Sequence, residues 1–306
     1  MLGPRTRALL DRYGLASREL SRVGGERSAT EPGQSVEFHD YRAYQPGDEL
    51  RYVDWRVYAR TGRLYTRLYQ AERSVRLHLV LDNSPSMTLY GKDRYGRTLT
   101  QLLTYVAQKD APTQLHLLDG RVSRPAQGLS GLKQSMRFID DAAQPTQGAR
   151  RAGTEQPAEQ PAEPVTSVMP ISALKRFAVT LPSVRGSALV LVVSDLLEDV
   201  ALRPTLAALR ARGVDVGFLQ VIAEEELKPP VALLELLDVE SGEKLPIGAA
   251  EVEAYRLEVR KFLARTRGAI LKAGYKHWLF KVPGADEEFE RAALAALIRS
   301  GILIKR

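Results

Sequence analysis

Two apolar stretches, "LHLVLD" at residues 77–82 and "SALVLVVSD" at residues 187–195, decide the fold of this chain. Each is a short, nearly continuous apolar run that ends in an aspartate. Runs of this kind are typical of strands that are buried on both faces of a parallel sheet. We therefore predict two buried parallel strands, which end at Asp82 and Asp195.

Further strands and helices alternate around these two runs. Other apolar runs predict strands at 113–120, 214–222 and 275–282, and "RVSRPAQG" predicts an edge hairpin at 121–128. Apolar residues at helical spacing predict helices over 97–109, 171–181, 204–213, 250–273 and 286–301. This alternation predicts an α/β fold built on a doubly wound, mostly parallel, Rossmann-like sheet.

Three segments do not fit the alternation. Residues 36–76 carry aromatic and β-branched residues between turn signals, which predicts short antiparallel strands, and residues 231–247 read as a hairpin. We expect an N-terminal segment with a small antiparallel β appendage over 1–74, joined by the 231–247 hairpin, and the α/β domain over 75–306. Residues 142–165 are rich in Pro, Gln, Ala and Glu, which predicts a flexible loop.

The composition excludes several classes of protein. The 306 residues are 44% hydrophobic and 26% charged, as in soluble globular proteins, and no stretch approaches the roughly 20 apolar residues of a membrane span. The absence of cysteine excludes disulfides and thiolate sites, and we expect a cytoplasmic protein. The net charge of +7 raises nucleic-acid binding as an alternative, but no aromatic RNA-binding signature or C-x-x-C finger supports it.

The two strand-ending aspartates form the candidate site. Ligands of open α/β sheets bind beyond the carboxyl ends of the strands, where both Asp82 and Asp195 would lie. Ser84 and Ser86 alternate with Asp82 in "DNSPS", so their oxygens can point in the same direction. Such hard oxygen ligands suit Mg²⁺ or Mn²⁺. Two carboxylates and a few hydroxyls leave an open coordination position, which favours an incoming carboxylate of another protein.

Other interpretations of "DNSPS" remain open. Asp, Ser and Pro form turns without any ligand. A metal ion at this place could also activate water, as in a metal-dependent hydrolase. A serine nucleophile is not expected, because no G-x-S-x-G elbow surrounds Ser84, and no P-loop motif for ATP is present. We expect a non-enzymatic protein.

The chain also resembles a known family over nearly its whole length. The resemblance is carried by "EFHDYRAYQPGDELRYVDWRVYARTGRLYTRLYQAE" at 37–72, followed by "LHLVLDNSPSM", "VVSDLLED" and "LLDVESGEKLPI". This series is similar to the bacterial domain-of-unknown-function family 58, whose members contain a von Willebrand factor type A-like domain. The resemblance implies that fold for residues 75–306.

It further implies a metal-ion-dependent adhesion site that binds Mg²⁺ or Mn²⁺. Asp82, Ser84 and Ser86 match its first loop and Asp195 its third, and the second loop would supply Thr166 or Ser167. Relatives in this family are typically encoded beside MoxR-type AAA+ ATPases. The resemblance therefore implies an adaptor that acts with such an ATPase or its client in protein maturation or stress responses.

The "GDELRYVDW" motif at 47–55 has two interpretations. In the structural one, Trp55 is a core anchor and the charged residues around it form ion pairs. In the functional one, this surface docks the ATPase or a client. Its candidate residues are Asp48, Arg51, Asp54, Trp55 and Arg56.

Overall fold

The computed structural model describes residues 2–16, 38–69, 76–143, 172–181, 188–197, 199–229, 235–237, 244–246, 249–284 and 288–306. The chain forms two compact units. The large unit comprises Met1–Arg22 and Val75–Arg306, and the small unit comprises Val23–Ser74. The predicted flexible loop at 142–165 lies almost wholly outside the described residues.

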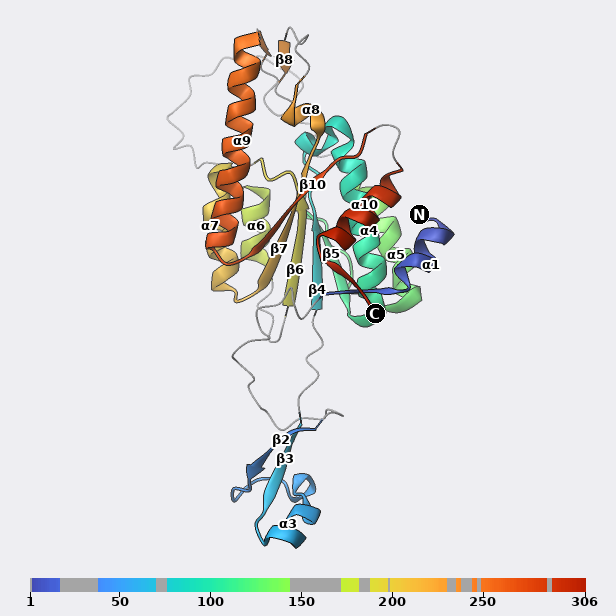
Figure 1. The fold of residues 1–306 in the computed structure, drawn as a ribbon, viewed down its shortest axis with the longest axis vertical. Coiled ribbons are helices and arrows are strands. Elements are labelled where there is room, and N and C mark those ends of the chain that lie inside the picture. Colours follow the sequence, from blue (N-terminus) through green and yellow to red (C-terminus); the bar gives the residue numbers. More distant parts are fainter. Residues whose placement is uncertain are drawn as a thin grey trace, which may run out of the picture. The chain divides into compact units, whose positions relative to one another are not determined.

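A five-stranded parallel sheet forms the centre of the large unit (Figure 1). Its strands are β4 (Arg76–Leu81), β5 (Thr113–Leu117), β6 (Ala188–Ser194), β7 (Asp215–Ile222) and β10 (Lys276–Lys281), in the order β10-β7-β6-β4-β5. Every residue of β6 and β7 is buried, as a parallel strand covered on both faces requires. The predicted α/β class with a parallel sheet is confirmed.

Helices cover both faces of this sheet (Figure 1). On one face lie α1 (Pro4–Leu10), α4 (Lys92–Asp110), α5 (Gly128–Asp140) and α10 (Phe289–Arg299), and on the other lie α6 (Ala173–Thr180), α7 (Asp199–Ala211) and α9 (Ala249–Lys272). Successive side chains of β4 point to opposite faces of the sheet. Leu77, Leu79 and Leu81 pack in the core on the face covered by α4, which we call the first core, and Val80 packs in the core on the other face. Helix α5 was not expected from the sequence.

Short elements connect this framework. They are the 3₁₀ helices η3 (Pro85–Gly91) and η4 (Asp141–Ala143), helix α8 (Glu224–Leu227), and the antiparallel hairpin of β8 (Glu235–Leu237) and β9 (Lys244–Pro246). The predicted edge hairpin is confirmed, because Val122 and Ala126 form antiparallel bridges with β5. None of the helices in the described ranges is long and apolar enough to cross a membrane.

The two ends of the described chain belong to the large unit. Strand β1 (Tyr13–Leu15) pairs antiparallel with β11 (Leu303–Lys305), and the Leu10 side chain is fully buried in the core. Residues 2–16 therefore lie with the α/β unit rather than with the appendage, because their apolar side chains complete its core. The β8–β9 hairpin likewise falls within the large unit, in a sheet of its own.

The small unit pairs β2 (Phe38–Ala43) antiparallel with β3 (Tyr65–Tyr69), and also contains the 3₁₀ helix η2 (Leu50–Tyr52) and helix α3 (Trp55–Thr61). The prediction of strands throughout this region was wrong for residues 55–61. Asp54 caps the helix by accepting the backbone N–H groups of Arg56 and Val57, and Gly62 ends it at a φ of 65°. These local signals outweigh the β propensity of the aromatic residues.

Candidate functional site

Asp82 and Asp195 lie at the carboxyl ends of two neighbouring strands. Asp82 follows β4 and Asp195 follows β6, and the N–H of Asp82 donates to Val193 O at 2.9 Å. After β4 the chain moves to β5 on one side, and it returns to β6 on the other side. This reversal of strand order is a topological switch point, where open α/β sheets bind their ligands. The structure thus brings the two predicted aspartates to that place.

The serines of the first loop lie against Asp82. The backbone N–H of Ser84 donates to Asp82 Oδ1 at 2.9 Å, and the Ser84 and Ser86 hydroxyls are 3.0 Å apart. Ser86 is buried and Ser84 is half-buried. Asp82, Ser84 and Ser86 therefore form one oxygen cluster, as the alternation in the sequence predicted.

Asp82 is a buried carboxylate whose charge no basic side chain of the described residues balances. Only 6% of its surface is exposed, and Ser194 Oγ donates to its Oδ2 at 2.5 Å. Within the described ranges, no lysine or arginine forms an ion pair with it. Burial, and then repulsion by Asp195, raise the pKa of Asp82 to about 6. A cation beside Asp82 would remove this penalty.

Asp195 differs from Asp82 because it has a buried cationic partner. The fully buried Lys92, the first residue of α4, donates to Asp195 Oδ2 at 2.9 Å and also forms an ion pair with Glu226 of α8. Burial alone would favour neutral Lys92, but the carboxylates of Asp195 and Glu226 outweigh it and raise the pKa of Lys92. No sequence pattern indicates this ion pair, because Lys92 and Glu226 are distant in the chain.

Further hydrogen bonds fix the loop that carries Asp195. Gln220 Nε2 donates to the backbone carbonyl of Asp195 at 2.9 Å. The side-chain oxygen of Gln220, Oε1, lies 2.9 Å from His277 Nε2. Glu226 accepts the N–H of Ala223 at 2.8 Å with its second oxygen. Asp195 is thus held by groups from α4, β7 and, through Lys92, from α8.

The backbone next to both halves of the site is strained. Tyr90 (φ 52°) and Leu196 (φ 58°) are the two non-glycine residues with positive φ in the described part of the chain. For L-residues this conformation costs about 1–2 kcal/mol, and such outliers cluster at functional sites. Ser194 Oγ accepts the N–H of Leu196 at 2.9 Å while it donates to Asp82. The strained residue Leu196 is therefore part of the hydrogen-bonded network around Asp82.

The donor set fits a hard divalent cation such as Mg²⁺ or Mn²⁺. Asp82 offers carboxylate oxygens and Ser84 and Ser86 offer hydroxyls, whereas one oxygen of Asp195 is already engaged by Lys92. The other accepts only a long bond, 3.3 Å, from the N–H of Leu197. No group of three or more His, Cys, Asp or Glu side chains that could hold a metal occurs among the residues described. Hydroxyl ligands would therefore be necessary. The predicted second-loop ligands, Thr166 and Ser167, lie outside the described residues.

A cavity of about 260 Å³ opens beside Asp195. Its lining includes Asp195 and Glu226 and, from α9, Tyr255, Val259 and Phe262 together with the charged Glu258 and Arg265. The cavity therefore combines apolar side chains with charged groups of both signs.

The second candidate surface lies on the small unit, and the structure corrects one interpretation of it. Trp55 is not a core anchor: it is the first residue of α3, and 56% of its surface is exposed. Among the described aromatic pairs it forms one, an edge-to-face pair with Tyr58. Three of the four charged residues form ion pairs: Asp48 pairs with Arg42 at 2.6 Å, Asp54 with Arg67 at 2.8 Å, and Arg51 with Glu49. Arg56 forms no ion pair with another described residue.

These contacts give the acidic residues structural roles. Asp54 caps α3 and also accepts the Tyr41 hydroxyl at 2.8 Å, and these bonds, led by that of Arg67, hold its pKa well below the usual range. Trp55 and Arg56 remain exposed on the surface of α3.

The fold and the site together define a Rossmann-like α/β protein with a carboxylate and hydroxyl cluster at its switch point. A family model described as "Protein of unknown function DUF58" matches residues 40–268, which include the small unit from residue 40 onward, the cluster and most of α9. The chain belongs to this family. A search of curated proteins finds no match.

Proposed function

We propose that the chain is a non-enzymatic protein-interaction module with a von Willebrand factor A-like domain and a metal-ion-dependent adhesion site. Asp82, Ser84, Ser86 and Asp195 would hold Mg²⁺ or Mn²⁺, with Thr166 or Ser167 as a further ligand. The observation that carries the proposal is that Asp82 and Asp195 lie together at the switch point, with Asp82 buried and without a basic partner in the described part of the chain.

The charges around the site support a cation. The carboxylates of Asp82, Asp195 and Glu226 outnumber the single ammonium of Lys92. An uncompensated buried charge is costly, and a divalent ion would balance it. A bound ion would supply an electrophilic centre and would favour the ionised form of Asp82, while the chain's own residues would position the ion.

An acidic side chain of a partner protein would complete the coordination. The partner we propose is a MoxR-type AAA+ ATPase or its client, which rests on the family resemblance. The cavity beside Asp195 supports a protein partner, because its apolar side chains and its charged groups would accept the residues next to the coordinating carboxylate.

Calorimetric titration with Mg²⁺ and Mn²⁺ tests the metal site. The parent protein should release or absorb heat saturably, and Asp82→Asn should abolish the response. Asp93→Asn is the matched control, since Asp93 pairs with Arg97 on the surface of α4, near the site but outside the donor set. Equal heats from the parent and Asp82→Asn would contradict the metal site.

Capture of the ATPase tests the mechanism. We expect an immobilised MoxR-type ATPase to retain the parent in Mg²⁺, and to lose it in EDTA or with Ser84→Ala. Capture that survives both changes would remove the metal from the interaction. Mg²⁺-dependent hydrolysis of a phosphate ester that requires Asp82 would instead favour the hydrolase.

A further inference from the structure

Strand β10 is an edge of the five-stranded sheet. It pairs with β7 on one side, and no strand in the described ranges pairs with its other side. Val282 donates its N–H to Ile222 O of β7 at 2.9 Å. Because backbone groups alternate in direction along a strand, those of Leu279 and Lys281 point away from β7. The outer edge of β10 therefore offers backbone donors and acceptors for another strand.

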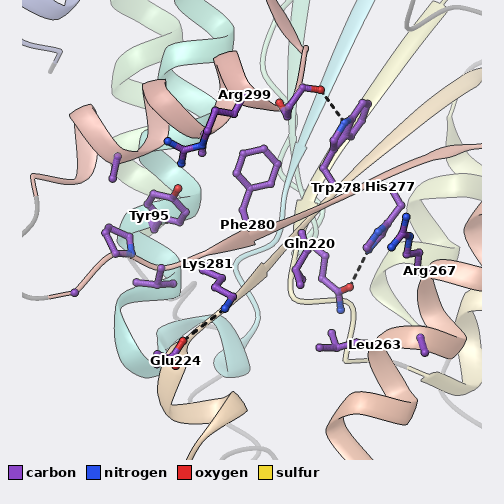
Figure 2. A pocket seen from close by; sticks show the side chains of 18 residues that line it. Tyr95, Gln220, Glu224, Leu263, Arg267, His277, Trp278, Phe280, Lys281 and Arg299 are labelled. Atoms are coloured by element: carbon purple, nitrogen blue, oxygen red, sulfur yellow. Dashed lines mark hydrogen bonds and ion pairs between the residues drawn. The ribbon is translucent and has the colours of Figure 1, made fainter.

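A groove of about 960 Å³ follows this edge (Figure 2). Strand β10 supplies its base, and α9 and α10 supply its two walls. The walls carry small side chains close to the strand, namely Ala264 on α9 and Ala292 and Ala296 on α10. Small residues leave room for the backbone of an added strand.

The apolar side chains of the groove are held in place by the fold. The Trp278 indole donates to Ser300 O at 3.2 Å and packs on Gly217, where an added Cβ would lie 2.7 Å from its ring. Phe280 is buried next to it, and Leu279, on the opposite face of β10, is 43% exposed. These side chains form a rigid surface for the apolar residues of an incoming segment.

Basic side chains flank the edge on both sides. Figure 2 shows Arg267 of α9 and Arg299 of α10 on opposite sides of β10. Both are exposed, and neither forms an ion pair with another described residue. Lys281 lies at the end of the strand, 3.9 Å from Glu224, which is closer to Lys228 at 2.9 Å. The positive charge of the groove is thus largely uncompensated.

We propose that this groove binds an extended acidic segment of another protein, which adds to β10 as a further strand. Main-chain hydrogen bonds to the outer edge of β10 would provide affinity, and Arg267, Arg299 and Lys281 would select acidic side chains. A second copy of the chain is a poorer occupant. It would bring its own Lys276 and Lys281, with both arginines, against the same charges. None of the proposed metal ligands in the described ranges lines this groove.

A fluorescein-labelled hexapeptide of alternating Glu and Val residues tests the proposal by fluorescence anisotropy. We expect saturable binding to the full chain, unchanged by EDTA and by Asp82→Asn, which separates this surface from the metal-dependent function. The matched alternating Lys and Val peptide should bind at least about tenfold more weakly, as should the Glu and Val peptide with N-methylated alternate amides, which cannot pair with a strand edge.

Variants of the protein distinguish the contribution of charge to peptide binding from that of backbone hydrogen bonds. Arg267→Glu with Arg299→Glu, both exposed and expected to fold, should weaken binding at least about tenfold. Leu279→Pro removes an outward N–H, a position where an edge strand tolerates proline, and should also weaken binding, whereas Leu279→Ala keeps that N–H and should retain most of it. Circular dichroism checks the fold of each variant.

Three results would overturn the proposal. They are the absence of binding at about 1 mM peptide, binding that the arginine double variant leaves unchanged, and equal binding of the N-methylated peptide. Light scattering that shows a dimer of the parent, lost in Leu279→Pro, would assign the edge to a second copy instead.

Discussion

The ammonium of Lys92 has no exposed surface and lies between the carboxylates of Asp195 and Glu226. Removing one partner of a buried ion pair leaves an uncompensated charge, which costs more than the pair itself contributes. Lys92 therefore connects the loop after β6 to the start of α8 and fixes the orientation of Asp195.

We expect Lys92→Met to lower the free energy of unfolding by about 3 kcal/mol or more, measured by urea denaturation. Lys281→Met is the control, because Lys281 is 61% exposed and 3.9 Å from Glu224. It should change stability by less than about 0.5 kcal/mol. Equal effects would mean that Asp195 and Glu226 do not depend on Lys92.

A buried pair of histidines links β4 to β5. His78 Nδ1 and His116 Nε2 are 3.0 Å apart, and the ring of Phe177 packs against His116. Burial, and then repulsion by His78, lower the pKa of His116 to about 4 from its ordinary 6.5. Burial also lowers the pKa of His78. Both rings are therefore neutral packing groups in the folded protein near pH 7.

The lowered pKa values predict a loss of stability in acid. As the pH falls below 6.5, the unfolded chain binds protons that the folded protein excludes until about pH 4. His116 alone should cost roughly 3 kcal/mol across that window. His116→Gln, which does not titrate, should flatten the pH dependence of urea unfolding between pH 6.5 and 4, with the slope above pH 7 unchanged. An unaltered slope below pH 6.5 would contradict this assignment.

At the scale of elements, β7 and β10 pack closely because position 217 of β7 is a glycine. A Cβ on Gly217 of β7 would lie 2.7 Å from the Trp278 ring and 2.8 Å from Leu191, so the close packing of both depends on glycine. Gly268 of α9 is different, because nothing lies within 4 Å of a Cβ built there.

Replacing glycine by alanine should therefore change the stability of the protein in opposite directions at these two positions. We expect Gly217→Ala to destabilise the protein by about 1–3 kcal/mol through overpacking. Gly268→Ala should stabilise it by up to about 1 kcal/mol, since alanine favours the helix interior. Thermal and urea unfolding measure both, and a stabilising Gly217→Ala would contradict the packing of Trp278 on β7.

Most central elements were predictable from local patterns. The continuous apolar runs predicted β4, β6 and β7, because a strand that is buried on both faces needs no polar residues at alternate positions. Helix α3 was missed because one capping aspartate outweighed an aromatic-rich pattern. The short strands β1 and β11 were missed because each has three residues and forms only against the other.

At the scale of the whole molecule, the N-terminal segment completes the α/β unit. Leu2, Leu10 and Ala16 are buried in the first core, and β1 pairs with β11. The small unit, Val23–Ser74, is inserted between this segment and β4.

Adjacent leucines of α1 test this arrangement. Leu10 is fully buried and Leu9 is 41% exposed. Leu10→Ala should lower the free energy of unfolding of the whole chain by about 2–5 kcal/mol, and Leu9→Ala by less than about 1 kcal/mol. If both substitutions had equally small effects, residues 2–16 would not be part of the cooperative core.

Local sequence patterns are sufficient to predict the α/β class, the two aspartates at the ends of buried strands, and the alternation of Asp82, Ser84 and Ser86. These features depend on neighbouring residues and on the two-residue period of a strand. Three other features become visible only in the folded chain: Lys92 neutralises Asp195, Trp55 is exposed, and β10 carries a basic groove. Each of these depends on which distant segments pack together and which surfaces they bury, and no local pattern encodes that.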